Sequence, residues 1–342
     1  MKIANSNSNL LSLSNTNFLR VVFEALVLIH HLYLVYTSFG AVITNAFGPI
    51  AVGGFIFLSG FGVGLSFINK GDEYVKKLLK IRLPRTYAII LIANLFYLAL
   101  YLITGGRFNN PFSAIASILY LPVFQGFVPL SHWIYFLADL IIYYLMFLLF
   151  IFIFKKTKDR LLWTAIAIIA LELIIIAVLS VVNYQTGSAR FLRGCLCFPI
   201  GLLCALFSGR LYKLVKKHKL LLTISLSLIS IVILAVFNYR PIKEYLLPIF
   251  TVLTLVVMLC GVKTKSRAIN YLSGLVIYVY VSHEFFLVLF KHLCSTLHID
   301  LHMNIIGLIV FACSMLFAIL INSVVKRCKV KLVKANSQLC VQ

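Results

Sequence analysis

The segment Phe18–Leu34, FLRVVFEALVLIHHLYL, has the apolar character of a membrane-spanning helix, yet it contains Arg20, Glu24, His30 and His31. At about 100° per residue, Arg20, Glu24 and His31 fall within about 40° of one another on one helix face, and His31 lies about 16 Å further along the axis than Arg20. Ionisable groups inside a bilayer cost several kcal/mol, so we expect them to mark a functional site. In a purely structural alternative, Glu24 pairs with Arg20 one turn away and the histidines only hydrogen-bond neighbouring helices.

The whole chain has the composition of a polytopic membrane protein. Its 342 residues are 62% hydrophobic and 12% charged, with a mean hydropathy of +1.04. We expect an all-α bundle of about ten transmembrane helices, because a span needs about 20 apolar residues. The apolar runs that meet this length fall near 18–38, 47–68, 86–105, 133–154, 161–182, 190–207, 220–236, 245–260, 272–293 and 303–325. The strip 112–125 is short and contains Pro122, so we interpret it as interfacial or re-entrant, and nine or eleven spans remain alternatives.

The formal net charge of +22 marks topology rather than a nucleic-acid partner. Most of the 31 Lys and Arg residues fall in every second loop, as the positive-inside rule requires when both termini are cytoplasmic. We therefore expect basic loops that lie against anionic lipid headgroups. The expected organisation is a flexible polar cytoplasmic lead at 1–17, a transmembrane domain at 18–325 and a basic cytoplasmic tail at 326–342, with no metal-ligand pattern among the cysteines.

Further ionisable residues lie inside later spans. Asp139 lies about two turns inside the fourth span, which begins near His132 and Trp133. Tyr280 and His283 are three residues apart and therefore share a helix face. We expect His283 at a depth similar to that of His31, about 16 Å into its span, if that helix starts at the inner surface.

The second span, AVGGFIFLSGFGVGLSF, is rich in glycine, with Gly60 and Gly64 at small-xxx-small spacing. Such glycines let helices approach closely, or they let backbone line a ligand tunnel, and the spacing leaves both possibilities open. After this span, Arg82 and Arg85 bracket Pro84, which suits the first turn of a helix. Two guanidiniums at a helix N-terminus favour the binding of a polyphosphate.

In combination, four motifs resemble the integral-membrane acyltransferases that include the O-antigen, capsule and Nod-factor O-acetyltransferases, known as acyltransferase family three. The motifs are Arg20 followed after ten residues by His31, the span GGFIFLSGFGVG, the Arg-x-x-Arg of Arg82 and Arg85, and VYVSH, which ends at His283. They occur in the family's order across nearly the whole chain. The segment YFLADLIIYYL also resembles a family region, although Trp133 is displaced relative to it.

The resemblance implies an O-acyltransferase, in the first instance an O-acetyltransferase, of the inner (plasma) membrane. Its donor would be acetyl-CoA or another acyl-CoA, and its acceptor a cell-surface polysaccharide, lipopolysaccharide or other glycolipid at the outer side of the membrane. By the same resemblance, His31 is the essential histidine, Arg20 its paired basic residue, and Arg82 with Arg85 the acyl-CoA-binding pair. His31 would act as a general base or as a nucleophile.

We assign Glu24, Asp139, Tyr280 and His283 supporting roles, although Glu24 does not map onto a family motif. The alternative function is a proton-coupled transporter or exporter of a polysaccharide precursor or an organic anion, in which buried His and Glu residues relay protons. It accounts less well for the Arg-x-x-Arg, and the broken helices of such transporters are not visible in the sequence.

Overall fold

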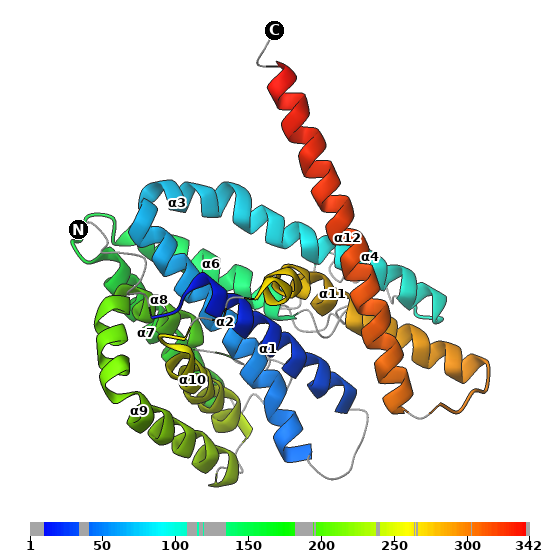
Figure 1. Ribbon diagram of the computed structural model, residues 1–342, viewed down its shortest axis with the longest axis horizontal. Coiled ribbons are helices and arrows are strands. Elements are labelled where there is room, and N and C mark those ends of the chain that lie inside the picture. The colour runs from blue at the N-terminus through cyan, green and yellow to red at the C-terminus, as the bar shows by residue number, and fades with distance from the viewer. Residues whose placement is uncertain are drawn as a thin grey trace. The chain divides into compact units, whose positions relative to one another are not determined.

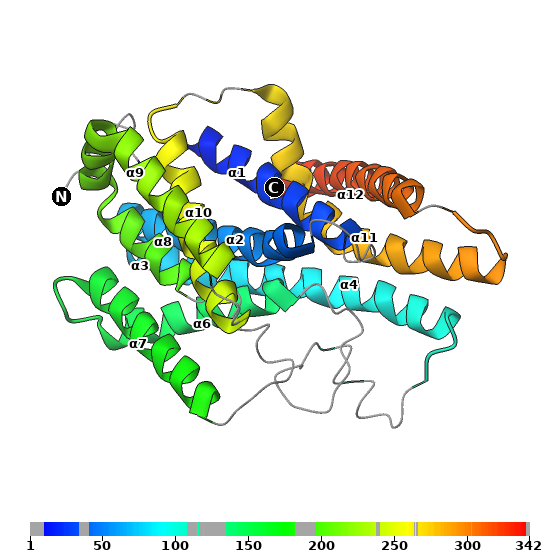
Figure 2. The same cartoon turned by 90° about the horizontal axis from the view of Figure 1, so that it is seen from below.

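The structure is a computed structural model that describes residues 10–33, 41–107, 115, 119, 135–181, 194, 196–236, 240–262, 264, 266–301 and 303–339. All regular secondary structure in these residues is helical (Figures 1 and 2). The helices are α1 Leu13–Tyr33, α2 Ala41–Lys70, α3 Asp72–Lys77, the π-helical turn η2 Leu78–Arg82, α4 Leu83–Ile103, α6 Tyr135–Ile153, α7 Arg160–Val181, α8 Cys197–Leu206, α9 Ser208–Val236, α10 Arg240–Leu259, α11 Arg267–Thr296 and α12 Met303–Leu339.

Within the described residues, 7 helical segments are long and apolar enough to cross a membrane. They are α2, the continuous segment from α3 through α4, α6, α7, α9, α11 and α12. The other three predicted spans correspond to α1, to α8 with only 10 residues, and to the shorter apolar stretch Glu244–Leu259 of α10. The chain is therefore a multi-pass helical membrane protein, and the count of ten spans stays a prediction. Nearly all of the strip 112–125 lies outside the described residues.

The surface of α9 shows why the bundle needs a membrane. Leu220, Leu221 and Ile231 expose 74%, 64% and 60% of their surfaces. A large exposed apolar surface is unfavourable in water but matches lipid tails. This helix is therefore a lipid-facing one.

The chain divides into two compact units, one formed by residues 1–92 and 132–265 and the other by residues 93–131 and 266–342. In the first unit, α2 packs against α1, α8, α10 and α6. A side chain at Gly60 would collide with the backbone carbonyl of Phe198 in α8, and one at Gly54 would collide with the Phe23 ring of α1. The glycines of α2 at these two positions therefore permit close helix packing, which is the first of the two possibilities that the sequence left open.

In the second unit, the last part of α4 packs with α11 and α12. The Tyr97 hydroxyl donates a hydrogen bond of 3.2 Å to the Val281 carbonyl oxygen. The Phe96 ring contacts both Phe285 of α11 and Phe317 of α12 edge-on, with centroid distances of 6.3 and 6.1 Å. Aromatic contacts thus join the three helices of this unit.

Residues 10–17, which we assigned to a flexible lead, are packed into the first unit. The Leu10 N–H donates to Ser208 Oγ at 2.8 Å, and Asn15 Nδ2 donates to the Leu259 carbonyl at 2.8 Å. Residues 1–9 lie outside the described residues. At the other end of the chain, α12 continues as one helix to Leu339, through most of the predicted basic tail.

Candidate active site

The polar face of α1 changes from exposed to buried along the helix. Arg20 is exposed, whereas Glu24 and His31 keep only 5% and 8% of their surfaces exposed. These three residues share one face by helix geometry. The face therefore leads from an exposed arginine to a buried imidazole.

His30 and His31 differ in their surroundings. Their rings meet edge-on at a centroid distance of 5.3 Å. The His30 ring also lies against Gly48 of α2, where an added Cβ would approach His30 Nε2 to 2.6 Å. His30 thus fits a helix-packing site formed by a glycine.

Glu24 has no hydrogen-bond partner for either carboxyl oxygen among the residues that the structure describes. The ion pair with Arg20 that the structural alternative requires is absent from this described part, so that alternative is wrong for Glu24. A buried polar group that lacks its hydrogen bond costs about 1–3 kcal/mol. Glu24 therefore destabilises the folded protein, and no pairing with a nearby described residue offsets this cost.

Arg82 lies at the end of the π-helical turn η2, and it contacts two tyrosines. Its Nη1 donates to the hydroxyl of Tyr74 in α3 at 2.8 Å. Its guanidinium carbon lies 5.0 Å from the ring centroid of Tyr144 in α6, a cation–π distance. Single π-helical turns are frequent at functional sites. Tyr74 of α3 and Tyr144 of α6 thus fix this one guanidinium of η2.

Arg20 lies near enough to Arg82 for the two positive charges to repel each other. Tyr144 interacts electrostatically with both arginines and with Ser59 of α2. Within the described ranges, neither arginine has an acidic partner. We call Arg20, Arg82, Tyr74 and Tyr144 the cationic cluster. Guanidiniums that lack a counter-charge, beside tyrosine hydroxyls, suit a phosphate group.

Arg85 does not join this cluster. It is exposed on the first turn of α4 and makes no hydrogen bond or ion pair with any residue described here. Of the two arginines of the Arg-x-x-Arg motif, only Arg82 contacts the two tyrosines, and Arg20 is the arginine that interacts with it electrostatically. The resemblance had paired Arg20 with His31, which is about 16 Å further along α1.

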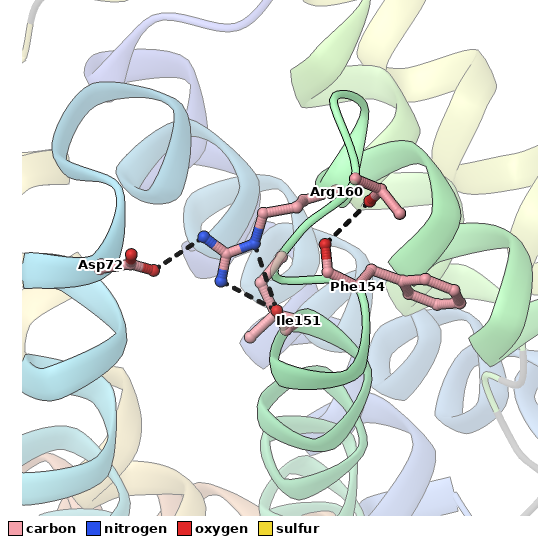
Figure 3. Close-up of polar contacts among 5 residues, drawn as sticks. Asp72, Ile151, Phe154 and Arg160 are labelled. Carbon is pink, nitrogen blue, oxygen red and sulfur yellow. Dashed lines mark hydrogen bonds and ion pairs between the residues drawn. The ribbon is translucent and has the colours of Figure 1, made fainter.

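Arg160, the first residue of α7, holds the elements that carry the two tyrosines (Figure 3). Its Nη1 bonds Asp72 Oδ1 of α3 at 2.8 Å, and its Nη2 donates to the Ile151 carbonyl of α6 at 2.9 Å. Its guanidinium also lies 5.4 Å from the Phe67 ring centroid. The contacts of Arg160 thus connect α3 to α6, the two helices that provide Tyr74 and Tyr144 of the cationic cluster.

Glu172 is a second buried carboxyl of the first unit, and at least one of its two oxygens is hydrogen-bonded. Its Oε2 accepts a hydrogen bond of 2.9 Å from the N–H of Leu196, the residue before α8, which has a φ of 65°. A carboxylate at a helix N-terminus interacts favourably with the helix dipole. Glu172 therefore fixes the start of α8.

Asp139 and the histidine of the second unit are buried, as expected for polar groups inside spans. Asp139 is 4% exposed and lies on α6 one turn before Tyr143, outside the cationic cluster. In the second unit, the Tyr280 and His283 rings lie 5.8 Å apart, which confirms that they share a face of α11. His283 Nδ1 lies 3.3 Å from the Val279 carbonyl oxygen. His132 and Trp133 lie outside the described residues.

The sequence did not single out Tyr74, Tyr144 or Arg160. Tyr144 lies in the YFLADLIIYYL segment, so the resemblance indicated its helix but not its contact with Arg82. Tyr74 lies eight residues before Arg82, on a short helix within a basic loop, and nothing in the composition distinguishes it. Among the residues that the structure describes, no group of three or more His, Cys, Asp or Glu side chains could hold a metal ion.

Comparison with known proteins adds a family. A family profile described as an acyltransferase domain, that of acyltransferase family 3, matches residues 14–324. No curated protein and no solved structure matches the chain. The match includes α1 from its second residue, the cationic cluster, all of α11 and nearly all of the membrane-spanning part of α12. The chain therefore belongs to acyltransferase family 3 and is a multi-pass membrane protein with an acyltransferase domain.

Proposed function

We propose that this protein is an acyl-CoA-dependent O-acyltransferase that transfers an acyl group, in the first instance acetyl, to a hydroxyl of a cell-surface glycan or glycolipid. In this proposal it lies in the inner (plasma) membrane with both termini cytoplasmic, and the acceptor meets it at the outer side. The observation that carries the proposal is the cationic cluster at the start of a helix face that continues to His31.

The spacing of the two ends of this face supports a long donor. Arg20 and Arg82 offer two guanidiniums to phosphate groups, and His31 lies about 16 Å beyond Arg20 along α1. A small acyl phosphate would not reach both. Acyl-CoA carries its phosphates at one end and its thioester at the other, so it fits both ends.

His31 would act through a neutral imidazole nitrogen, by one of two routes. As a general base, it removes the proton of the acceptor hydroxyl while the hydroxyl oxygen attacks the thioester carbonyl carbon. The carbon–sulfur bond then breaks, and the CoA thiolate takes the proton from the imidazolium. As a nucleophile, the His31 nitrogen would attack the thioester carbonyl carbon, break its carbon–sulfur bond and release the CoA thiolate, which leaves an acyl-imidazole. The acceptor hydroxyl would then attack this acyl group and release the imidazole, and its proton would pass to the thiolate. Trapping of an acylated His31 peptide by mass spectrometry distinguishes these routes.

The proposal also gives supporting roles to residues outside the cationic cluster. Arg85, exposed one turn after Arg82, adds positive charge near the phosphates without a fixed geometry. Asp139, Tyr280 and His283 are buried polar groups that would support the bundle or the acceptor.

The direct test uses the full chain in proteoliposomes with acetyl-CoA and glycan acceptors. We expect transfer of an acetyl group from acetyl-CoA, and an acetyl-sized mass difference between surface glycans of cells with and without the gene. Loss of the whole glycan on deletion, together with no acetyl transfer in proteoliposomes, would contradict the proposal and favour a transporter.

A further inference from the structure

Glu24 is the polar group of the α1 face that the proposed function leaves without a role. It is 5% exposed, and both carboxyl oxygens lack a partner among the described residues. Glu172, equally deep in the same unit, is 3% exposed but accepts a backbone N–H. Burial alone therefore does not leave both oxygens of a carboxyl in this protein without a partner.

The position of Glu24 along α1 indicates what its partner is. Glu24 lies about 6 Å beyond Arg20 and about 10.5 Å before His31, at 1.5 Å per residue. It is on the same face as both. A donor whose phosphates lie at Arg20 and whose thioester lies at His31 therefore passes Glu24 with its middle section.

We propose that Glu24 accepts a hydrogen bond from an amide N–H of the pantetheine arm of the acyl donor. The inference rests on the proposed acyl-CoA-dependent function. The arm joins the phosphates to the thioester through two amide groups, and each amide brings an N–H donor that must be satisfied in a buried site. Glu24 supplies the acceptor that such a donor needs.

Access to Glu24 follows from the change in exposure along α1. Arg20 is exposed, but the carboxyl of Glu24 one turn further is buried. The arm thus has to part the side chains between these two levels as it enters. Its amide then replaces the missing hydrogen-bond partner of the carboxyl.

The test compares three acetyl thioesters with the full chain in lipid. Acetyl-CoA has phosphates and amides, acetyl-pantetheine has the amides but no phosphates, and S-propyl thioacetate has neither. We expect Glu24→Leu to lower kcat/KM about tenfold for both amide-bearing donors, mainly through KM, and to leave S-propyl thioacetate unchanged. Glu24→Gln, which keeps an acceptor oxygen, should lose no more than about threefold.

Glu172→Gln is the matched control, because it alters a buried carboxyl that has a backbone partner. It should not change the ratio of activities among the three donors. An equal loss by Glu24→Leu with all three donors would overturn the inference, and so would a Glu24→Gln variant that has normal KM but as little turnover as Glu24→Leu. If Glu24→Leu does not fold, an unchanged KM for both amide-bearing donors in a third variant, Glu24→Met, overturns the inference and a raised KM supports it. Failure of the proposed function is distinct, because the wild-type chain itself would then not use acetyl-CoA.

Discussion

Two regions of the first unit lie next to α2, and they differ in whether their buried carboxyl groups have a hydrogen-bond partner. At the interface of α2 with α8, glycines allow the backbones to touch, and the buried Glu172 of α7 accepts a hydrogen bond from the backbone N–H just before α8. At the junction with α1, Glu24 is unpartnered, and Arg20 lies beside Arg82 without an acidic partner in the described ranges. In a region that serves only the fold, buried polar groups have at least one hydrogen-bond partner, as Glu172 does at Oε2. The α1 region leaves them open, as a binding site does.

Replacement of His31 should give the largest difference between an effect on catalysis and an effect on stability. We expect His31→Ala to lower kcat for acyl transfer at least about a hundredfold, because it removes the base or nucleophile, while thermal unfolding stays close to wild type. Acyl-transfer assays beside thermal melts check this expectation. His30→Ala is the matched control, since the His30 ring packs on Gly48, and it should affect the melt more than the rate.

A change in the α2–α8 interface should have the opposite profile. Gly60→Ala places a Cβ against the Phe198 carbonyl and should lower the free energy of unfolding by about 1–3 kcal/mol, with KM for acetyl-CoA unchanged in the folded fraction. Gly62→Ala is the control, because a Cβ at Gly62 meets no atom within 4 Å. Equal melting temperatures for the two variants would contradict the role of Gly60 in close packing.

Replacement of Glu172 should also lower stability, but by less than Gly60→Ala does. Glu172→Gln keeps an acceptor for the Leu196 N–H but removes a carboxylate from the start of α8, so we expect a loss of about 1 kcal/mol in the free energy of unfolding. Denaturation of the purified protein in detergent measures it. A large loss of catalytic rate with normal stability would move Glu172 from the structural region to the functional one.

The sequence predicts the helical membrane bundle because apolar runs are local signals of span length. It also predicts the shared face of Arg20, Glu24 and His31, since that depends only on helix geometry. It does not predict that Arg20 lies near Arg82, because the two are 62 positions apart in the chain and only the packing of α1, α2 and α3 brings them together. Nor does it predict that Glu24 is unpaired, because side-chain packing decides whether residues one turn apart meet.

The central claim is that the cationic cluster holds the phosphate end of the acyl donor. The most direct measurement is KM of wild type and Arg82→Ala for acetyl-CoA and for acetyl-pantetheine, which lacks the terminal phosphates, with exposed Arg85→Ala as the matched control. The account predicts that Arg82→Ala raises KM for acetyl-CoA about tenfold or more, leaves KM for acetyl-pantetheine unchanged, and exceeds Arg85→Ala in its effect. An equal rise for both donors would contradict it.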